Sequence, residues 1–166
     1  MESHGEEVFR HRRGIGGMSL HQGGGLVVSG RNISFKDFSS SETKVLLERD
    51  EAQGLVGFND ITADDAGRIY AGGLGSSPVF EDGRAPQSES LYLIDLDGSI
   101  VKVAEDIRLT NGLGFSPDRR LLYHSDSLRR QVCVYEVRDN GLLGSKQVFI
   151  ETDYTPADDV LIPFLR

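Results

Sequence analysis

The apolar residues of this 166-residue chain come in short runs separated by Gly, Asp, Asn and Ser. No segment sustains the i, i+3, i+4, i+7 spacing of an amphipathic helix for long. Short runs of β-branched and aromatic residues between turn residues are typical of β-strands. We therefore expect an all-β chain, with strands at residues 26–28, 33–38, 68–71, 91–96, 100–104, 121–124, 132–137 and 147–150.

Two further local patterns concern a segment of uncertain type and the expected turns. Residues 44–51 fit either a helix or a strand centred on Val45–Leu47, and the pattern leaves both interpretations open. Asp97-Gly98 and Asn140-Gly141 lie between expected strands and are typical of hairpin turns.

The expected strands recur as a set. Residues 62–70 match residues 115–123 at an offset of 53, and residues 20–30 match residues 62–72 at an offset of 42. Each copy is followed by two further expected strands, the first set ending with residues 43–47. A period of roughly 40 to 50 residues with several short strands per unit predicts β-propeller blades. An antiparallel sandwich is the alternative.

The charge and composition of the chain exclude several classes of partner. Eighteen basic residues against 26 acidic ones give a net charge of −8 and a pI near 5.0. Nucleic acid and anionic membranes attract basic surfaces, so we expect neither as a partner. No run is long and apolar enough to span a bilayer, and the acidic start does not resemble a secretory signal. Cys133 stands alone, which fits a reducing compartment, and we expect a cytoplasmic protein.

Three polar residues occupy matching places in the repeat, where one set of strands ends and the next begins. These are Asn59, Asn111 and Asp158. Because the innermost strand of each blade lines the channel of a propeller, their oxygens would point into one funnel and suit a hard cation or a sugar. Asn and Asp also favour the turn before a strand, and the pattern alone leaves that interpretation open.

Several segments carry a resemblance to a known family. They are Phe58-Asn59-Asp60-Ile61-Thr62-Ala63-Asp64, Gly67-Arg68-Ile69-Tyr70-Ala71-Gly72, residues 110–118 and residues 122–127. In combination and order they resemble the SMP-30/gluconolactonase/regucalcin-like family, from about Gly14 to Phe149. The resemblance implies a six-bladed β-propeller of metal-dependent lactonases. We expect residues 14–166 to form about three of its blades, preceded by a poorly ordered segment at residues 1–13.

The resemblance also implies a site. One divalent cation (Ca, Zn, Mg or Mn) would be held by a Glu, by Asn111 and by Asp158, with Asp158 also the catalytic acid/base. Asn59 would bind the substrate, a small-molecule sugar lactone. This sequence departs from the family pattern at three places. Ala157 separates Asp158 from Pro156, and Gly57 stands where some members have Arg. The Gly-Glu-Gly segment of the first blade has no accepted match upstream of Asn59.

Two functions therefore stay open. One is a metal-dependent lactone hydrolase acting on a sugar lactone. The other is a non-catalytic propeller fragment, or a module that binds a ligand or partner without turnover. The Glu of the first blade distinguishes them. In either case three blades leave the ring open, so we also expect self-association through the open blade edges.

Overall fold

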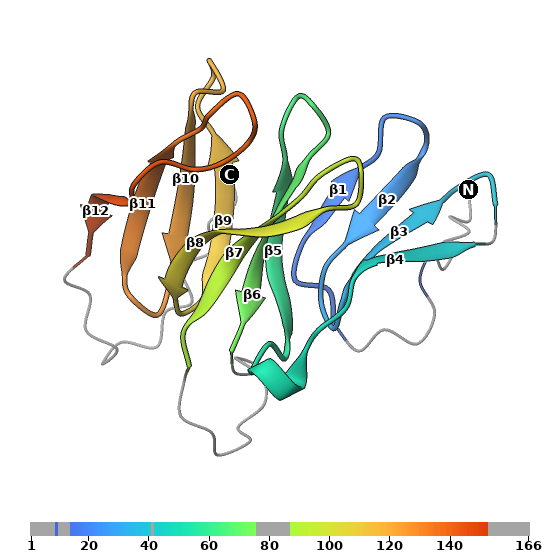
Figure 1. Ribbon diagram of the computed structural model, residues 1–166, viewed down its shortest axis with the longest axis horizontal. Coiled ribbons are helices and arrows are strands. Elements are labelled where there is room, and N and C mark those ends of the chain that lie inside the picture. Colours follow the sequence, from blue (N-terminus) through green and yellow to red (C-terminus); the bar gives the residue numbers. More distant parts are fainter. Residues whose placement is uncertain (1–8, 10–13, 41, 76–86, 153–166) are drawn as a thin grey trace, which may run out of the picture.

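A computed structural model describes residues 9, 14–40, 42–75 and 87–152. These residues form three four-stranded antiparallel sheets and one 3-10 turn, Glu51–Gln53 (Figure 1). In chain order the strands are β1 (Met18–Leu20), β2 (Gly25–Val28), β3 (Ile33–Asp37), β4 (Thr43–Leu47), β5 (Gly57–Ala63), β6 (Ile69–Leu74), β7 (Glu89–Ile94), β8 (Ile100–Ile107), β9 (Thr110–Phe115), β10 (Leu121–Asp126), β11 (Gln131–Glu136) and β12 (Gln147–Glu151). Within these residues no helix has the length and hydropathy to cross a membrane.

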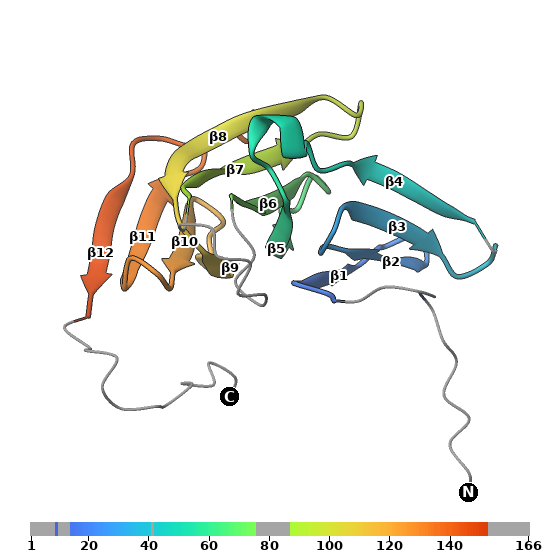
Figure 2. The same ribbon diagram turned by 90° about the horizontal axis from the view of Figure 1, so that it is seen from below.

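Each sheet is a meander that starts with a strand on the concave side of the molecule and ends with a strand on its convex side (Figure 2). The sheets are β1–β4, β5–β8 and β9–β12, and they stand face to face along an arc (Figures 1 and 2). The first strands of the sheets lie side by side, with β5 between β1 and β9. The arrangement is that of three propeller blades, which confirms the all-β blade prediction over the sandwich alternative.

Two apolar clusters hold neighbouring blades together. Between the first and second sheets, Ile33 packs with Phe58 and Tyr92, whose rings meet edge to face at 6.0 Å. Between the second and third sheets the cluster includes Tyr70 and Leu122, both fully buried. Each such side chain contributes about 1.5–3 kcal/mol by leaving water. Blade-to-blade packing therefore supplies the stability that no single sheet has alone.

The strand predictions are confirmed at all eight expected segments, and the strand at 43–47 is present as β4. The helix interpretation of residues 44–51 is wrong, because Val45 pairs with Ser34 of β3 and only residues 51–53 coil into a 3-10 turn. The Asp97-Gly98 turn joins β7 to β8 as expected, with Gly98 at φ +84°. Asn140-Gly141 also forms a tight turn, within a longer connection between β11 and β12.

Strand pairing fixes the register of the repeat. The first turn of each sheet is closed by a backbone hydrogen bond, from His21 N to Gly25 O in the first sheet and from Asp64 N to Arg68 O in the second. Equivalent residues in these two sheets are therefore 43 positions apart (64 and 21). The offset of 42 expected from the sequence is wrong by one residue, because side-chain similarity alone did not fix the pairing.

The third sheet has a longer first turn. It is closed from Ser116 N to Leu121 O, which encloses one more residue than the turn from Asp64 to Arg68. The offset between the second and third sheets is consequently 52 before the turn (116 and 64) and 53 after it (121 and 68). The expected offset of 53 is correct only for the strands that follow the turn.

The expected segment at residues 1–13 lies outside the described residues apart from Phe9, as does Asp158.

Candidate functional site

Two β-bulges lie in neighbouring inner strands at the same height. In β5 the bulge contains Asn59–Asp60, opposite Gly72 of β6. In β9 it contains Asn111–Gly112, opposite Ser125 of β10. The two asparagines are 52 residues apart, which is the offset of these strands, so they occupy equivalent positions. A bulge takes a residue out of the regular ladder and redirects its side chain, which is a common device beside functional sites.

The first bulge reaches the second through a side chain. The amide nitrogen of Asn59 donates a hydrogen bond to the carbonyl oxygen of Thr110 at 2.5 Å. Thr110 precedes Asn111, which is exposed, so the Asn59 side chain ends at the peptide group that leads into the second asparagine. Because the amide nitrogen of Asn59 donates to this carbonyl, the amide oxygen of Asn59 points away from Thr110. That oxygen is the atom with which an amide accepts from a hydroxyl or binds a cation.

The first sheet approaches this site through two glycines and the hydroxyl of Ser29. The residues equivalent to Asn59 and Asp60 are Gly16 and Gly17. A Cβ at Gly16 would lie 2.5 Å from the backbone oxygen of Asn59, and one at Gly17 would lie 2.6 Å from a carboxylate oxygen of Asp60. The same backbone oxygen accepts a hydrogen bond from the Ser29 hydroxyl. Only glycines allow so close an approach.

Asp60 is a residue that the sequence analysis did not single out. Its carboxylate accepts a hydrogen bond from its neighbour Ile61 N at 2.9 Å and another from Leu113 N of β9. Burial raises the pKa of this half-buried carboxyl, although both backbone hydrogen bonds lower it. Asp60 thus links the bulge of β5 to β9. Its only sequence signal is its place in the Phe-Asn-Asp segment.

The Thr110 side chain is held in place by a buried polar contact. Its hydroxyl lies 3.1 Å from Nε2 of His124, a residue only 1% exposed. Burial lowers the pKa of His124 to about 4, so the imidazole is neutral at neutral pH. Gly72 of the second sheet packs closely against Thr110, since a Cβ at Gly72 would lie 2.2 Å from the Thr110 side chain. The carbonyl that holds Asn59 therefore belongs to a tightly packed residue.

The predicted metal centre is only partly within the described residues. Asn111 is included and Asp158 is not. In the ranges that the structure describes, no group of three or more His, Cys, Asp or Glu side chains is arranged to hold a metal ion. The structure therefore brings Asn59 close to the peptide before Asn111, while their roles and the participation of Asp158 stay predictions.

Comparison with known proteins identifies the family. Residues 1–161 match the SMP-30/Gluconolactonase/LRE-like region. The chain belongs to this family. It is 29% identical to a pentonolactonase from Haloferax volcanii, covering 86% of this chain and 46% of that one. It is 30% identical to regucalcin from Danio rerio, covering 81% and 45%, and 30% identical to a 6-deoxy-6-sulfogluconolactonase from Pseudomonas putida, covering 82% and 45%.

Solved structures agree on the fold. A putative gluconolactonase superposes with a TM-score of 0.68 at 19% identity, covering 84% of this chain and 50% of that one. A regucalcin from Agrobacterium tumefaciens superposes with a TM-score of 0.63 at 21% identity, covering 81% and 44%. The chain thus spans about half the length of the relatives that it matches. It contains about three blades of the family's six-bladed propeller.

Proposed function

We propose that this chain supplies part of the active site of a metal-dependent lactone hydrolase that acts on a sugar lactone. The observation that carries the proposal is the pair of matched bulges, in which the Asn59 side chain donates to the carbonyl of Thr110, the residue before Asn111. The chain belongs to a family with relatives named pentonolactonase and 6-deoxy-6-sulfogluconolactonase. These names support a lactone as the molecule that binds beside Asn59 and Asn111.

In this proposal Asn111 and Asp158 hold one divalent cation, which can be Ca, Zn, Mg or Mn. Amide and carboxylate oxygens suit the harder of these ions, and Zn also accepts carboxylate oxygen. When bound, the cation polarises the lactone carbonyl as a Lewis acid. Asn59, whose amide nitrogen is fixed on Thr110, presents its oxygen to a hydroxyl of the sugar ring.

The remaining steps belong to the protein's carboxylate and to water. Asp158 takes a proton from the attacking water, whose oxygen bonds to the lactone carbonyl carbon. The ring C–O bond then breaks, and the proton passes to the departing ring oxygen. The product is the open-chain sugar acid, with one water consumed.

Isothermal titration calorimetry with each divalent cation tests the assignment. We expect Asn111→Ala to weaken cation binding more than Asn59→Ala does, since only Asn111 is assigned as a ligand. Asn59→Ala should instead weaken binding of a sugar lactone measured in the presence of the cation. The matched control is Asn32→Ala, because Asn32 lies in the turn between β2 and β3, where its side chain donates a hydrogen bond to Glu48. Equal cation affinities in the two site variants would contradict the roles.

A hydrolysis assay with a panel of sugar lactones separates the two functions that the sequence leaves open. Metal-dependent turnover that falls in both Asn variants supports the hydrolase. We expect cation and lactone binding with little or no turnover from this chain alone, because it supplies only part of the site; taken by itself, that outcome describes a non-catalytic binding module. If neither cation nor lactone binds, the proposed site is wrong.

A further inference from the structure

Among the described residues, no other sheet covers the face of the third sheet that points away from the second (Figure 2). Leu122 of β10 is buried against the second sheet. Side chains alternate along a strand, so this outer face carries Leu121, Tyr123 and Ser125, and none of the three is buried. Tyr123 meets Phe149 of β12 there, with ring centroids 5.2 Å apart, and Phe149 is 56% exposed. The outer face is therefore largely apolar and open.

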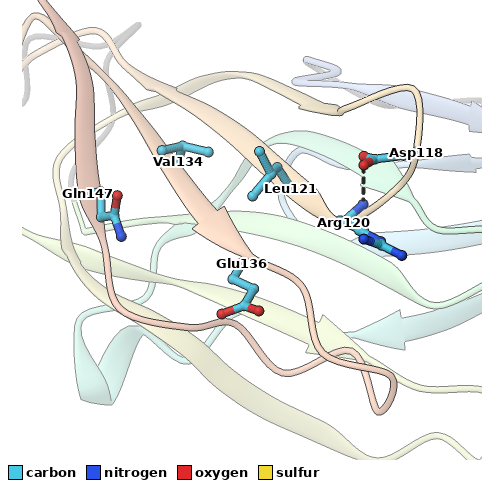
Figure 3. A pocket seen from close by; sticks show the side chains of 6 residues that line it. All are labelled: Asp118, Arg120, Leu121, Val134, Glu136 and Gln147. Atoms are coloured by element: carbon cyan, nitrogen blue, oxygen red, sulfur yellow. Dashed lines mark hydrogen bonds between the residues drawn. The ribbon is translucent and has the colours of Figure 1, made fainter.

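The same face has room for further side chains. Leu121 and Val134 form the apolar part of a shallow depression of about 410 Å³ (Figure 3). Its polar rim consists of Asp118, Arg120, Glu136 and Gln147. Gly114 of β9 pairs with Tyr123, and a Cβ at Gly114 would meet no atom within 4 Å. An apolar centre with a polar rim is the usual anatomy of a contact surface.

In the other two sheets, the equivalent face is covered by the first strand of the next sheet. Tyr70 lies 53 residues before Tyr123, which is the offset of the strands after the first turn. It is fully buried, and its ring meets Phe115 of β9 at 5.5 Å. The equivalent residue of the first sheet is Val27, which is 5% exposed and belongs to the same apolar cluster as Ile61 of β5. Each sheet thus buries this face against its successor, as repeat units do.

The two covering strands share a pattern of three positions that face the preceding sheet. The positions are spaced three and then two residues apart, because the bulge inserts one residue before the alternation resumes. In β5 they are Phe58, Ile61 and Ala63, and in β9 they are Thr110, Leu113 and Phe115. The side chains of β5 belong to or border the first apolar cluster, and those of β9 pack on the second sheet.

The same pattern occurs once more in the sequence after β12. Residues 153–166 lie outside the described residues. Their sequence repeats the spacing of three and two with Ala157, Val160 and Ile162. Asp158 then stands at the place of Asn111. A shift of one residue in either direction would put a carboxylate on the apolar face, either Asp158 or Asp159, and burying an unpaired charge there is costly. The pattern therefore selects one register.

The connection to this segment has a suitable length. The last strand of the first sheet ends at Leu47, 11 residues before Phe58, and that of the second sheet ends at Ile107, three residues before Thr110. The last strand of the third sheet ends at Glu151, six residues before residue 157. Six residues lie between the two lengths that already join one sheet to the next.

We propose that the occupant of the outer face is residues 157–162 of the same chain, which lie along β9 as β9 lies along β5. Ile162 packs on Tyr123 in the way that Phe115 packs on Tyr70. The segment is thus the first strand of a further blade, and it buries apolar surface that the third sheet otherwise exposes. The inference rests on the repeat and does not depend on the proposed function.

A second contact follows from the same register. Ser125 is equivalent to Gly72, and a Cβ at Gly72 would lie 2.2 Å from the Thr110 side chain. The place of Thr110 is taken by Ala157. Two small residues, Ser and Ala, therefore meet where the backbones of neighbouring sheets approach most closely. Asp158, the next residue, continues the row formed by the two asparagines of the bulges.

Paired cysteines test this contact in the 166-residue chain. Ser125→Cys with Ala157→Cys should form an intramolecular disulfide under mild oxidation, because β-carbons in contact suit the bond. The matched control is Ser125→Cys with Leu161→Cys, since alternation turns residue 161 away from the third sheet. The control should form the bond at least about 10-fold more slowly. Cys133 is 2% exposed and stays in both proteins.

Peptide mass mapping without reduction identifies which cysteines are joined, and circular dichroism checks that each variant folds. An intramolecular bond in the first pair alone supports the proposal. Equal rates in the two pairs, or no bond in a folded chain, would overturn it. A bond between two chains would also overturn it, and would assign the face to a second copy.

Thermal unfolding gives an independent test through the second pair of residues. Ile162→Ala should lower the Tm by about 5 °C or more, because it removes an apolar side chain buried against Tyr123. Leu161→Ala is the control and should lower the Tm by less than about 2 °C. In a Tyr123→Ala background, Ile162→Ala should lose most of its effect, because the contact is already absent. Additive effects, or equal effects of the two single substitutions at 161 and 162, would overturn the proposal.

Discussion

His124 should make the folded protein lose stability between pH 7 and pH 5. The imidazole is 1% exposed, and its Nε2 lies 3.1 Å from the Thr110 hydroxyl. Burial lowers its pKa from 6.5 to about 4, an effect that the nearby Asp126 carboxylate opposes only in part. In the unfolded chain the same side chain titrates at its ordinary pKa.

The sign follows from which state takes up the proton first. As the pH falls through 6.5, the unfolded state binds a proton that the folded state does not accept until about pH 4. Stability is therefore complete above pH 6.5 and is lost between pH 6.5 and pH 4. The difference between the two pKa values corresponds to about 3 kcal/mol in total, of which about 2 kcal/mol is lost by pH 5.

Urea unfolding followed by far-UV circular dichroism at pH 7, 6 and 5 measures this loss at fixed protein concentration. His124→Gln should remove most of the pH dependence in this window, whereas His21→Gln, at an exposed histidine, should keep it. The half-buried carboxyl of Asp60 has a raised pKa and acts in the opposite direction, but it is present in all three proteins and cancels in the comparison. The reasoning is refuted if His124→Gln retains the pH dependence of the wild type.

Three further substitutions test the packing around the site, each by the free energy of unfolding in urea at pH 7. Gly72→Ala should cost about 1–3 kcal/mol, because its Cβ would overlap the Thr110 side chain, and an unchanged midpoint would show that the sheets separate without strain. Asp126→Ala should cost about 3 kcal/mol or more, because the buried carboxylate accepts hydrogen bonds from three backbone N–H groups, and a loss below 1 kcal/mol would mean that water replaces it. Tyr70→Phe should cost about 1 kcal/mol by removing the buried hydroxyl that donates to Gly141 O at 2.8 Å, and a stabilised variant would contradict that contact.

The outer strands of each blade could be predicted from the sequence and the inner ones could not. The expected strands at 91–96 and 132–137 begin with the apolar runs 91–94 and 132–135, and both runs lie in strands, β7 and β11. The inner strands β5 and β9 are interrupted by Asn, Asp and Gly, and a bulge breaks their alternation. Strands that line a channel need polar side chains, so they lack the pattern by which strands are recognised.

Some residues of the candidate site could likewise be predicted from the sequence and others could not. The repeat and the family motifs place Asn59 and Asn111 at matching positions, because that information lies in local sequence. Thr110 and Asp60 lie in the same family segments, but nothing in the sequence indicates the contacts that they make. Their contacts join strands about 50 residues apart in the chain, and the spacing of residues within either strand does not reveal them.

The extra residue in the turn from Ser116 to Leu121 shows that the turn and the bulge of a blade can change independently. The turn follows the inner strand, whereas the bulge lies near the start of that strand, so a change in turn length leaves the heights of Asn59 and Asn111 matched. The length of this turn can therefore change without disturbing the matched bulges at the other end of the strands. For engineering, the same turn is a suitable position for an epitope or a short inserted peptide.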